Sequence, residues 1–571
     1  MMRAIGSCLL AVLLAACIAN RSFSGSDDGS SPPTSDFAVT PAEATVAAGA
    51  TQQFSASVDD GGAVIWQVDG VSGGNATVGT ISADGLYTAP LLPPAGGSAT
   101  VTAVSGADSD KVGSALVDID YSNASLQGAY VFSWRGTVAS GPFAAIGRFE
   151  ADGNGGIDSG REDINLPGGV YLDLAFNGSY EIAANGTGQA VLVSSRGSVE
   201  LRFTIGRHGG AEVIRVDSGA AAAGEILPQG DDVPATLAGD YVFRVGGTGE
   251  AALQSETVGR FTGDDGAIGA GLLDRNRGGA VVRGVPFSGE YAVGDAGHGT
   301  MRLSDTRSID RYTFYIASSG EILLLRVDAG VPFTGRALEQ DSGDFGDSDL
   351  SGDYAFYLFG SGGTMAAATA GLFNAGGDGN IGDGLFSSNE GVIQQSTALT
   401  GTYAIDAGGR GIATFFSPGG RTDMAFYMQS PDHALVLAFD AAVRGGEFIA
   451  QPGDDFTTAV LDGPYTLASA GVDNTLVGRL VLDGDGKVAD GVELAAAGGT
   501  PQAIALDGSY TMEPVGRGEL ALLTEGGGRE DYIIWVIDPA RALLLGSGPG
   551  AISLAWLRLQ WPAADGQGEA Q

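Results

Sequence analysis

The sequence predicts an all-β protein in which a small β-sandwich precedes four tandem β domains of one kind. Short runs that alternate apolar and polar residues are separated by Gly, Pro and Asp, and no segment keeps a helical period over ten residues. A pattern of about 110 residues then occurs four times, which indicates repeated domains. With 571 residues, 44% of them hydrophobic, the chain has enough apolar material for several cores.

The charge of the chain restricts its partners. Acidic residues outnumber basic ones 68 to 29, which gives a formal net charge of −39. Such a surface repels phosphate backbones, so we expect no nucleic-acid partner. It also suits a protein that stays soluble outside the cell.

Residues 1–17, MMRAIGSCLLAVLLAAC, are typical of a secretory signal peptide. One Arg precedes a small and apolar run, Ala4 to Ala16, which is too short to span a bilayer. The signal ends in LAAC at residues 14–17, which resembles the bacterial lipobox. This resemblance implies that Cys17 becomes the first residue of the mature chain, with diacylglycerol on its thiol and an acyl group on its amino nitrogen. Several lipid chains anchor stably, so the implied partner is a membrane.

Further features of the N-terminus refine this expectation. Cys8, the only other cysteine, would leave with the signal peptide. Ile18, rather than Asp, follows Cys17, and by analogy with such lipoproteins this implies the bacterial outer membrane, facing the periplasm or the cell surface. Residues 18–35 are rich in Ser, Gly, Pro and Asp, so we expect a flexible tether there.

Residues 36–120 change to short β segments such as TVAAGATQQFSASV, AVIWQVDG and GTISADGLYTAP. With Pro41, the Ala-Gly turn before Phe54 and the GTIS and DGLYTAP segments, this region resembles the bacterial immunoglobulin-like domains of group 2. The resemblance implies an Ig-like sandwich. Trp66, within the strand pattern VIWQV, is predicted to lie in its core.

The four repeats open with LQGAYVF, LAGDYVF, LSGDYAF and LDGPYTL. Their tyrosines recur at nearly constant spacing, and each copy has a second Gly-x-Tyr and ends on a Gln. The opening tyrosines are Tyr130, Tyr241, Tyr354 and Tyr465, and the closing glutamines are Gln229, Gln340, Gln451 and Gln560. The repeats are predicted at residues 123–229, 234–340, 347–451 and 458–560, with a disordered tail at 561–571.

Each repeat contains about eight strand-like runs joined by short turns. Eight antiparallel strands predict a closed meander barrel or a two-sheet sandwich, loosely similar to avidin- and lipocalin-type barrels. Because a half-repeat of about 50 residues is also visible, an eight-bladed β-propeller is the alternative. Acidic, turn-rich linkers recur only at the full period, which favours four domains.

The segment VLDGDGKVADG at residues 481–491 raises the question of calcium. Aligned to an EF-hand loop, Asp483 and Asp485 fill two ligand positions, but the first and last are Val. The sister turn keeps Asp152 and Asn154, and what recurs in all four copies is an Asx-Gly turn between strands. We therefore expect hairpin turns, with weak calcium binding at these four residues as the alternative.

Catalytic patterns are scarce. The three histidines, His208, His298 and His433, lie in predicted turns at no shared repeat position, and no HExxH, CxxC or P-loop pattern occurs. The adjacent Glu162 and Asp163 are expected by chance among so many acidic residues. We predict no enzyme activity, no cofactor and no structural metal.

The predicted function is therefore a non-catalytic, lipid-anchored envelope or surface protein that acts in adhesion, spacing or extracellular ligand binding. Its ligand would be a glycan, a protein or a small molecule, and tandem domains suit such work because weak contacts add. The alternative is small-molecule or glycan binding inside each barrel. A secreted hydrolase is the third hypothesis.

Overall fold

A computed structural model describes residues 37–561 except 58–62, 218, 231, 249–252, 319, 363–364, 454, 470–475, 496–501 and 549–552. The predicted signal peptide with Cys17, the tether and all of the predicted tail but Trp561 lie outside the described residues. In the described part, no helix is long and apolar enough to cross a membrane.

The N-terminal domain is a β-sandwich. A five-stranded sheet (β2-β11-β10-β5-β6) and a four-stranded sheet (β3-β9-β8-β7) enclose its core, and β1 pairs with β4. Trp66 is buried there with Phe54 and Tyr87, which confirms its predicted place. The strands are β1 Val39–Thr40, β2 Glu43–Ala47, β3 Thr51–Gln53, β4 Ser55–Ala56, β5 Val64–Val68, β6 Val71–Ser72, β7 Gly74–Asn75, β8 Gly79–Ile81, β9 Leu86–Thr88, β10 Ser98–Ser105 and β11 Val112–Asp120.

The remaining described strands form four closed barrels of eight strands each. Barrel 1 consists of β12 Gln127–Val138, β13 Gly141–Asp152, β14 Gly156–Leu166, β15 Gly169–Ile182, β16 Thr187–Ser194, β17 Gly197–Ile205, β18 Ala211–Arg215 and β19 Ala220–Gln229. Barrel 2 consists of β20 Gly239–Thr248, β21 Gln254–Asp264, β22 Ala267–Arg277, β23 Ala280–Val293, β24 His298–Ser304, β25 Ile309–Ile316, β26 Ile322–Arg326 and β27 Thr334–Glu339. Barrel 3 consists of β28 Ser351–Gly362, β29 Met365–Gly376, β30 Asn380–Asn389, β31 Ile393–Ile405, β32 Arg410–Ser417, β33 Gly420–Ser430, β34 His433–Ala438 and β35 Val443–Ala450. Barrel 4 consists of β36 Asp462–Ser469, β37 Leu476–Asp483, β38 Lys487–Ala495, β39 Gln502–Met512, β40 Arg517–Thr524, β41 Arg529–Asp538, β42 Arg541–Gly546 and β43 Leu554–Leu559.

Each barrel is an antiparallel meander in which the first strand pairs with the last. In barrel 1, for example, β12 pairs with both β13 and β19. The barrel prediction is confirmed. The propeller alternative is wrong, because the two halves of each repeat form one closed eight-stranded barrel instead of two separate blades. Short 3-10 turns lie at η1 Ala95–Gly97, η2 Asn123–Ser125, η4 Asp295–Gly297, η5 Asp347–Asp349 and η6 Thr458–Val460.

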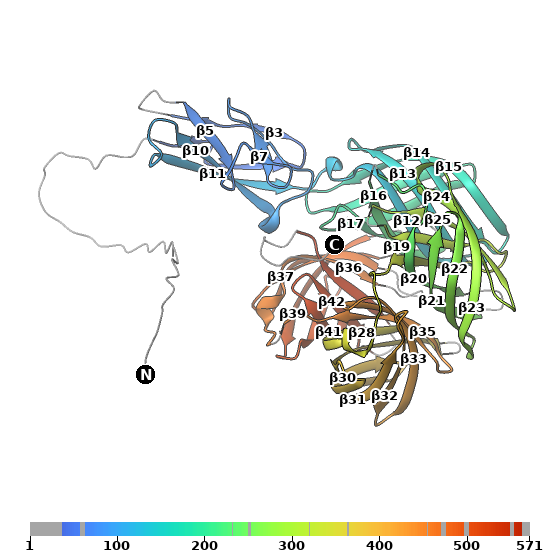
Figure 1. Ribbon diagram of the computed structural model, residues 1–571. Helices are drawn as coiled ribbons and strands as arrows, with labels where there is room; N and C mark the ends of the chain where they lie inside the picture. The colour runs from blue at the N-terminus through green and yellow to red at the C-terminus, as the bar shows by residue number, and fades with distance from the viewer. Residues whose placement is uncertain are drawn as a thin grey trace, which may run out of the picture.

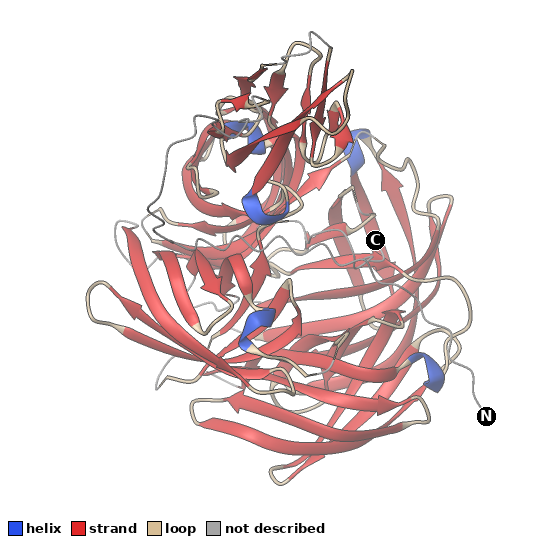
Figure 2. Cartoon of the chain, turned by 90° about the vertical axis from the view of Figure 1, so that its left-hand side faces the viewer, coloured by secondary structure: helices blue, strands red, loops and turns tan. Residues whose placement is uncertain are grey.

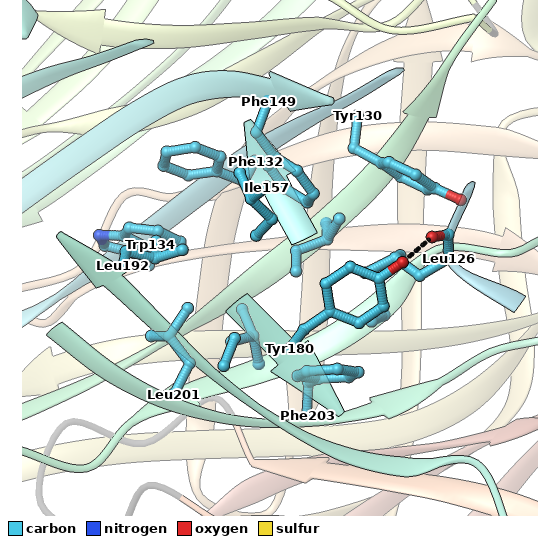
Figure 3. Close-up of a cluster of buried hydrophobic side chains, with 14 of the residues drawn as sticks. Leu126, Tyr130, Phe132, Trp134, Phe149, Ile157, Tyr180, Leu192, Leu201 and Phe203 are labelled. Carbon is cyan, nitrogen blue, oxygen red and sulfur yellow. Dashed lines mark hydrogen bonds between the residues drawn. The ribbon is translucent and has the colours of Figure 1, made fainter. Parts of the chain in front are cut away.

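Apolar side chains form a core inside each barrel. In barrel 1 the inward residues include Phe132, Trp134 and Phe203, and the other barrels have equivalent clusters. The second tyrosine of each repeat closes one end of its barrel, as Figure 3 shows for Tyr180, whose hydroxyl donates to the carbonyl of Leu126 at 2.7 Å. The same bond joins Tyr291 to Leu237, Tyr403 to Leu350 and Tyr510 to Leu461, at 2.6, 2.7 and 2.8 Å.

The four barrels pack against one another in cyclic order, as a ring (Figures 1 and 2). A buried apolar cluster lies at each of the four interfaces, between the outer faces of the first strands of one barrel and the sixth and seventh strands of the next. The clusters include Val131, Ile146, Tyr315 and Leu323 between barrels 1 and 2; Val242, Val258, Tyr427 and Leu435 between 2 and 3; Ala355, Leu372, Trp535 and Leu543 between 3 and 4; and Val477, Leu494, Ile214 and Val216 between 4 and 1.

The closing glutamines join each barrel to the next. The Gln229 amide donates to the Ile316 carbonyl at 2.7 Å, and three equivalent bonds follow around the ring. These run from Gln340 to Met428 at 2.6 Å, from Gln451 to Val536 at 2.5 Å, and from Gln560 to Ile205 at 2.9 Å. The last bond returns from barrel 4 to barrel 1, so the ring is closed.

The N-terminal domain lies where barrel 4 meets barrel 1. Tyr121, just after its last strand, donates its backbone N–H to the Ala184 carbonyl of barrel 1 at 3.1 Å. The Tyr121 hydroxyl donates to the Gln560 carbonyl of barrel 4 at 3.2 Å. Leu92 packs against the core of barrel 1. The Ig-like domain therefore braces the interface that closes the ring.

Candidate functional site

A cavity of about 820 Å³ lies between the four barrels, and residues from all four line it. Its volume falls in the range of small-molecule sites. The outer faces of the first and last strands of each barrel supply most of its wall. We call it the central cavity.

Strand alternation decides which side chains face the central cavity. In β12, Phe132 and Trp134 point into barrel 1, so Ser133 and Arg135 point outward. The positions equivalent to Ser133 in the later repeats are Arg244, Tyr357 and Ala468. On the last strand of each barrel, the positions equivalent to Glu225 are Arg336, Glu447 and Trp556. Equivalent strands of the four repeats therefore form the wall of the cavity. Because the residues at equivalent positions differ, the sides of the wall differ in charge and polarity.

One half of the lining is a network between barrels 2 and 3. Arg244 Nε lies 2.5 Å from Glu256 Oε1, and its Nη1 donates to the Tyr357 hydroxyl at 3.4 Å. That hydroxyl in turn donates to Glu447 Oε1 at 2.8 Å, and His433 Nε2 lies 3.1 Å from Glu447 Oε2. Burial acts to raise the pKa of Glu447, but the His433 hydrogen bond and nearby arginines hold it well below its usual range.

The other half of the lining crosses to barrel 1. Arg336 Nη2 lies 2.7 Å from Glu225 Oε1, and its Nη1 lies 3.0 Å from Glu321 Oε1. The charges of Glu225 and Glu321 raise the pKa of Arg336 well above its usual value. Arg558 of barrel 4 pairs with Glu212 of barrel 1. Ion pairs therefore add to the apolar contacts between barrels.

Arg135 differs from the other arginines of the central cavity. Its side chain is exposed to the hollow, yet protein atoms surround it, and their burial of the charge lowers the pKa of its guanidinium. Among the described residues, no carboxylate lies within ion-pair distance of it. The lining thus contains three paired arginines and one guanidinium with no partner of its own.

The predicted calcium candidates lie on hairpin turns outside the central cavity. Asp483 Oδ1 accepts the backbone N–H groups of Asp485 and Lys487 at 2.9 and 2.8 Å. Asp152 Oδ1 accepts those of Asn154 and Gly156 at 2.7 and 2.8 Å. No group of three or more potential metal-ligating side chains occurs in the described residues. The hairpin turns stay the prediction for these residues, with weak calcium binding as the alternative.

Glu162 and Asp163 point to opposite sides of β14 and do not form a pair. Asp163 is fully buried between barrels 1 and 2, where it accepts a hydrogen bond from the Thr313 hydroxyl at 2.6 Å and lies 2.9 Å from His298 Nε2. Burial raises the pKa of Glu162 to about 7.

Sequence reasoning missed the partners of two histidines. His298 and His433 begin strands β24 and β34, and each contacts a carboxylate, Asp163 or Glu447. The His298–Asp163 pair joins two repeats, so spacing along the chain does not reveal it, whereas His433 and Glu447 lie on the neighbouring strands β34 and β35. The sequence contained one signal for contacts between repeats, the closing Gln. A polar residue that is kept at one strand end in all four copies indicates a shared hydrogen bond.

Comparison with known proteins identifies one region. Residues 33–114 match the bacterial Ig-like domain (group 2) family. No curated protein matches the chain. The chain is similar to a crystal structure of a double mutant of the vaccine antigen transferrin-binding protein B from Haemophilus parasuis, at 9% identity, with 62% of this chain and 82% of that chain covered. The TM-score of 0.17 is too low to indicate a common arrangement of the whole chains.

Proposed function

We propose that this protein is a lipid-anchored envelope protein that binds a small ligand, without catalysis, in the central cavity of its four-barrel ring. One observation carries the proposal: a cavity of about 820 Å³ with charged and aromatic walls lies where all four barrels meet. A pocket between domains is a common place for a ligand site. The Cys17 anchor and the tether would hold the ring near the outer membrane, facing the periplasm or the medium.

The packed barrels support this location over the alternative of one site inside each barrel. Apolar side chains form the core of each barrel. Charged side chains inside a barrel, such as Arg275, Asp310 and Arg326 of barrel 2, pair with one another. The cyclic packing also replaces an extended string of independent domains. We therefore favour one shared site over several weak ones.

The pairing of the lining residues supports a binding role. Glu212, Glu225, Glu256 and Glu447 each contact an arginine, a tyrosine or a histidine. Paired groups of this kind hold a shape and a charge pattern, whereas catalysis needs a group that is activated and free to react.

A second candidate function is adhesion through the N-terminal domain, which the match of residues 33–114 favours. The domain lies at one edge of the ring, and its strands include exposed apolar residues such as Ile65 and Leu86. A protein or a glycan would be its partner.

Two experiments test these proposals. Detergent partitioning and mass spectrometry of the mature N-terminus should find a lipidated Cys17, and Cys17→Ser should release the protein into the soluble fraction. Thermal-shift screening of the purified chain with metabolites and glycan fragments should find compounds that raise its melting temperature. A Cys17→Ser variant that stays in the membrane contradicts the anchor, and a screen without any stabilising compound contradicts the binding role.

A further inference from the structure

We propose that the ligand of the central cavity is an organic anion whose carboxylate or phosphate group pairs with Arg135. This inference rests on the proposed function, because it names the chemistry of the ligand for the same site. Its starting point is the position of Arg135 on the outer face of β12, directed into the hollow.

The charge balance of the lining supports an anion. Arg244, Arg336 and Arg558 each have a carboxylate partner, at distances of 2.5 and 2.7 Å for the first two. Among the described residues Arg135 has none. A guanidinium that faces a cavity without a carboxylate at ion-pair distance is free to pair with a bound anion, and the protein walls of the cavity strengthen that attraction. The planar fork of the guanidinium suits two parallel hydrogen bonds to a carboxylate or a phosphate.

The repeats indicate that the site is single. Arg135 lies five residues after the opening tyrosine, and the equivalent positions in the later copies are Gly246, Phe359 and Ala470. Only the first copy therefore places a cation there. One anion per ring is the expected stoichiometry.

The walls of the cavity indicate that the anion carries an apolar body. Phe359 and Val443 of barrel 3 line the cavity, and so does Trp556 of barrel 4, whose ring lies 4.8 Å from the Arg558 guanidinium. These side chains offer apolar surface, and a free inorganic ion would leave most of it without contact. An aromatic or alkyl carboxylate or phosphate would use both features.

Isothermal titration calorimetry with the full mature chain tests the proposal. The probes are benzoate and phenyl phosphate, with benzamide and benzyl alcohol as neutral analogues of similar shape, at constant ionic strength. We expect the anions to bind at one per chain, at least tenfold more tightly than the neutral analogues. Arg135→Gln should abolish that preference, and Arg135→Lys should keep part of it because the charge remains.

Arg307→Gln is the matched control, because Arg307 is exposed on a turn of barrel 2 outside the cavity. This variant should bind like the wild type. If the neutral analogues bind as well as the anions, or Arg135→Gln keeps the preference, the anion inference is wrong and ligand binding still stands. If no probe of either kind binds, both proposals are contradicted. The preference in the wild-type chain decides the matter even if Arg135→Gln fails to fold.

Discussion

At the scale of single residues, polar side chains at a few positions join one barrel to the next. The four closing glutamines donate to carbonyls of the neighbouring barrel. Asp163 joins barrel 1 to barrel 2 through His298, and Asp274 joins barrel 2 to barrel 3 through Arg410, whose Nε lies 2.8 Å from the carboxylate. Buried hydrogen bonds of this kind fix orientation, because a barrel that rotates leaves them unsatisfied.

The His298–Asp163 contact predicts a pH-dependent interface. The hydrogen bond to Asp163 raises the pKa of His298 above its usual value, and Asp173 and Arg161 lie nearby. A raised histidine pKa stabilises the folded state fully below the unfolded value of about 6.5, and this stability is lost as the pH rises through the folded value. His298→Gln should therefore lower stability by roughly 1–2 kcal/mol at pH 5.5 and by less at pH 8.5. Denaturant unfolding at both pH values measures this, and equal losses would refute it.

For Glu493 we predict a substitution that stabilises the protein, although its titration also lowers stability as the pH rises. Burial raises the pKa of this carboxyl in barrel 4 to about 7. The folded state therefore loses stability as the pH rises from about 4.5, the unfolded value, to about 7. Glu493→Gln should stabilise the protein at pH 8, by up to about 3 kcal/mol, and should have little effect at pH 4. Glu525, exposed on the turn between β40 and β41, provides the control, since Glu525→Gln should change stability little at either pH. A destabilised Glu493→Gln at pH 8 would contradict a carboxyl whose pKa is raised by burial.

At the scale of elements, strands buried on both faces distinguish this protein from a string of separate barrels. β26, β34 and β42 read ILLLR, HALVLA and RALLLG, without the alternation of a strand that faces water on one side. One face of each strand packs inside its barrel and the other contacts the neighbouring barrel.

The strands that are buried on both faces mark the limit of what the sequence predicts about the structure. The repeat period, the turns and the inward tyrosines predict four eight-stranded domains, and the barrels follow from them. The continuous apolar runs indicate a second buried face, but they do not identify what covers it. The central cavity depends on outward residues such as Arg135, Tyr357 and Trp556 from three barrels. Their meeting follows from the ring, so the strand pattern of a single repeat cannot predict the site.

An isolated barrel should therefore be poorly soluble. Barrel 3 alone, residues 347–451, would expose Tyr427, Leu435 and Leu437 on one side and Ala355 and Leu372 on another. We expect this fragment to aggregate or to bind the dye ANS strongly. The fragment 36–120 is the control and should stay soluble, because its hydrophobic core consists of residues of the N-terminal domain alone. A monomeric barrel 3 without dye binding would contradict the role of the outer faces.

At the scale of the whole molecule, the ring closes at the interface with the smallest of the four buried apolar clusters. The buried apolar cluster between barrels 4 and 1 is smaller than that between barrels 3 and 4. The Arg558–Glu212 ion pair, the Gln560 hydrogen bond and the bracing Tyr121 add to it. We infer that this interface is the one that opens first under denaturant.

Opening of this interface has a measurable signature. Gln560→Ala should lower the midpoint of the first unfolding transition. Gln340→Ala, at the interface between barrels 2 and 3 that the buried Asp274–Arg410 ion pair also joins, should affect a later one. Each substitution should cost about 1–3 kcal/mol, because it leaves a buried carbonyl without its donor. Hydrogen exchange resolved by mass spectrometry distinguishes the transitions. Earlier exchange between barrels 2 and 3 in the wild type would contradict the order.

Small-angle X-ray scattering of the fragment 37–561 tests the closed ring most directly. A compact chain of this size has a radius of gyration of about 24 Å. The projecting Ig-like domain increases this moderately, so the closed ring predicts a value below roughly 30 Å. Five domains in an extended string, each about 35 Å across, would give a radius of gyration of about 50 Å, and a measurement near that larger value would contradict the ring.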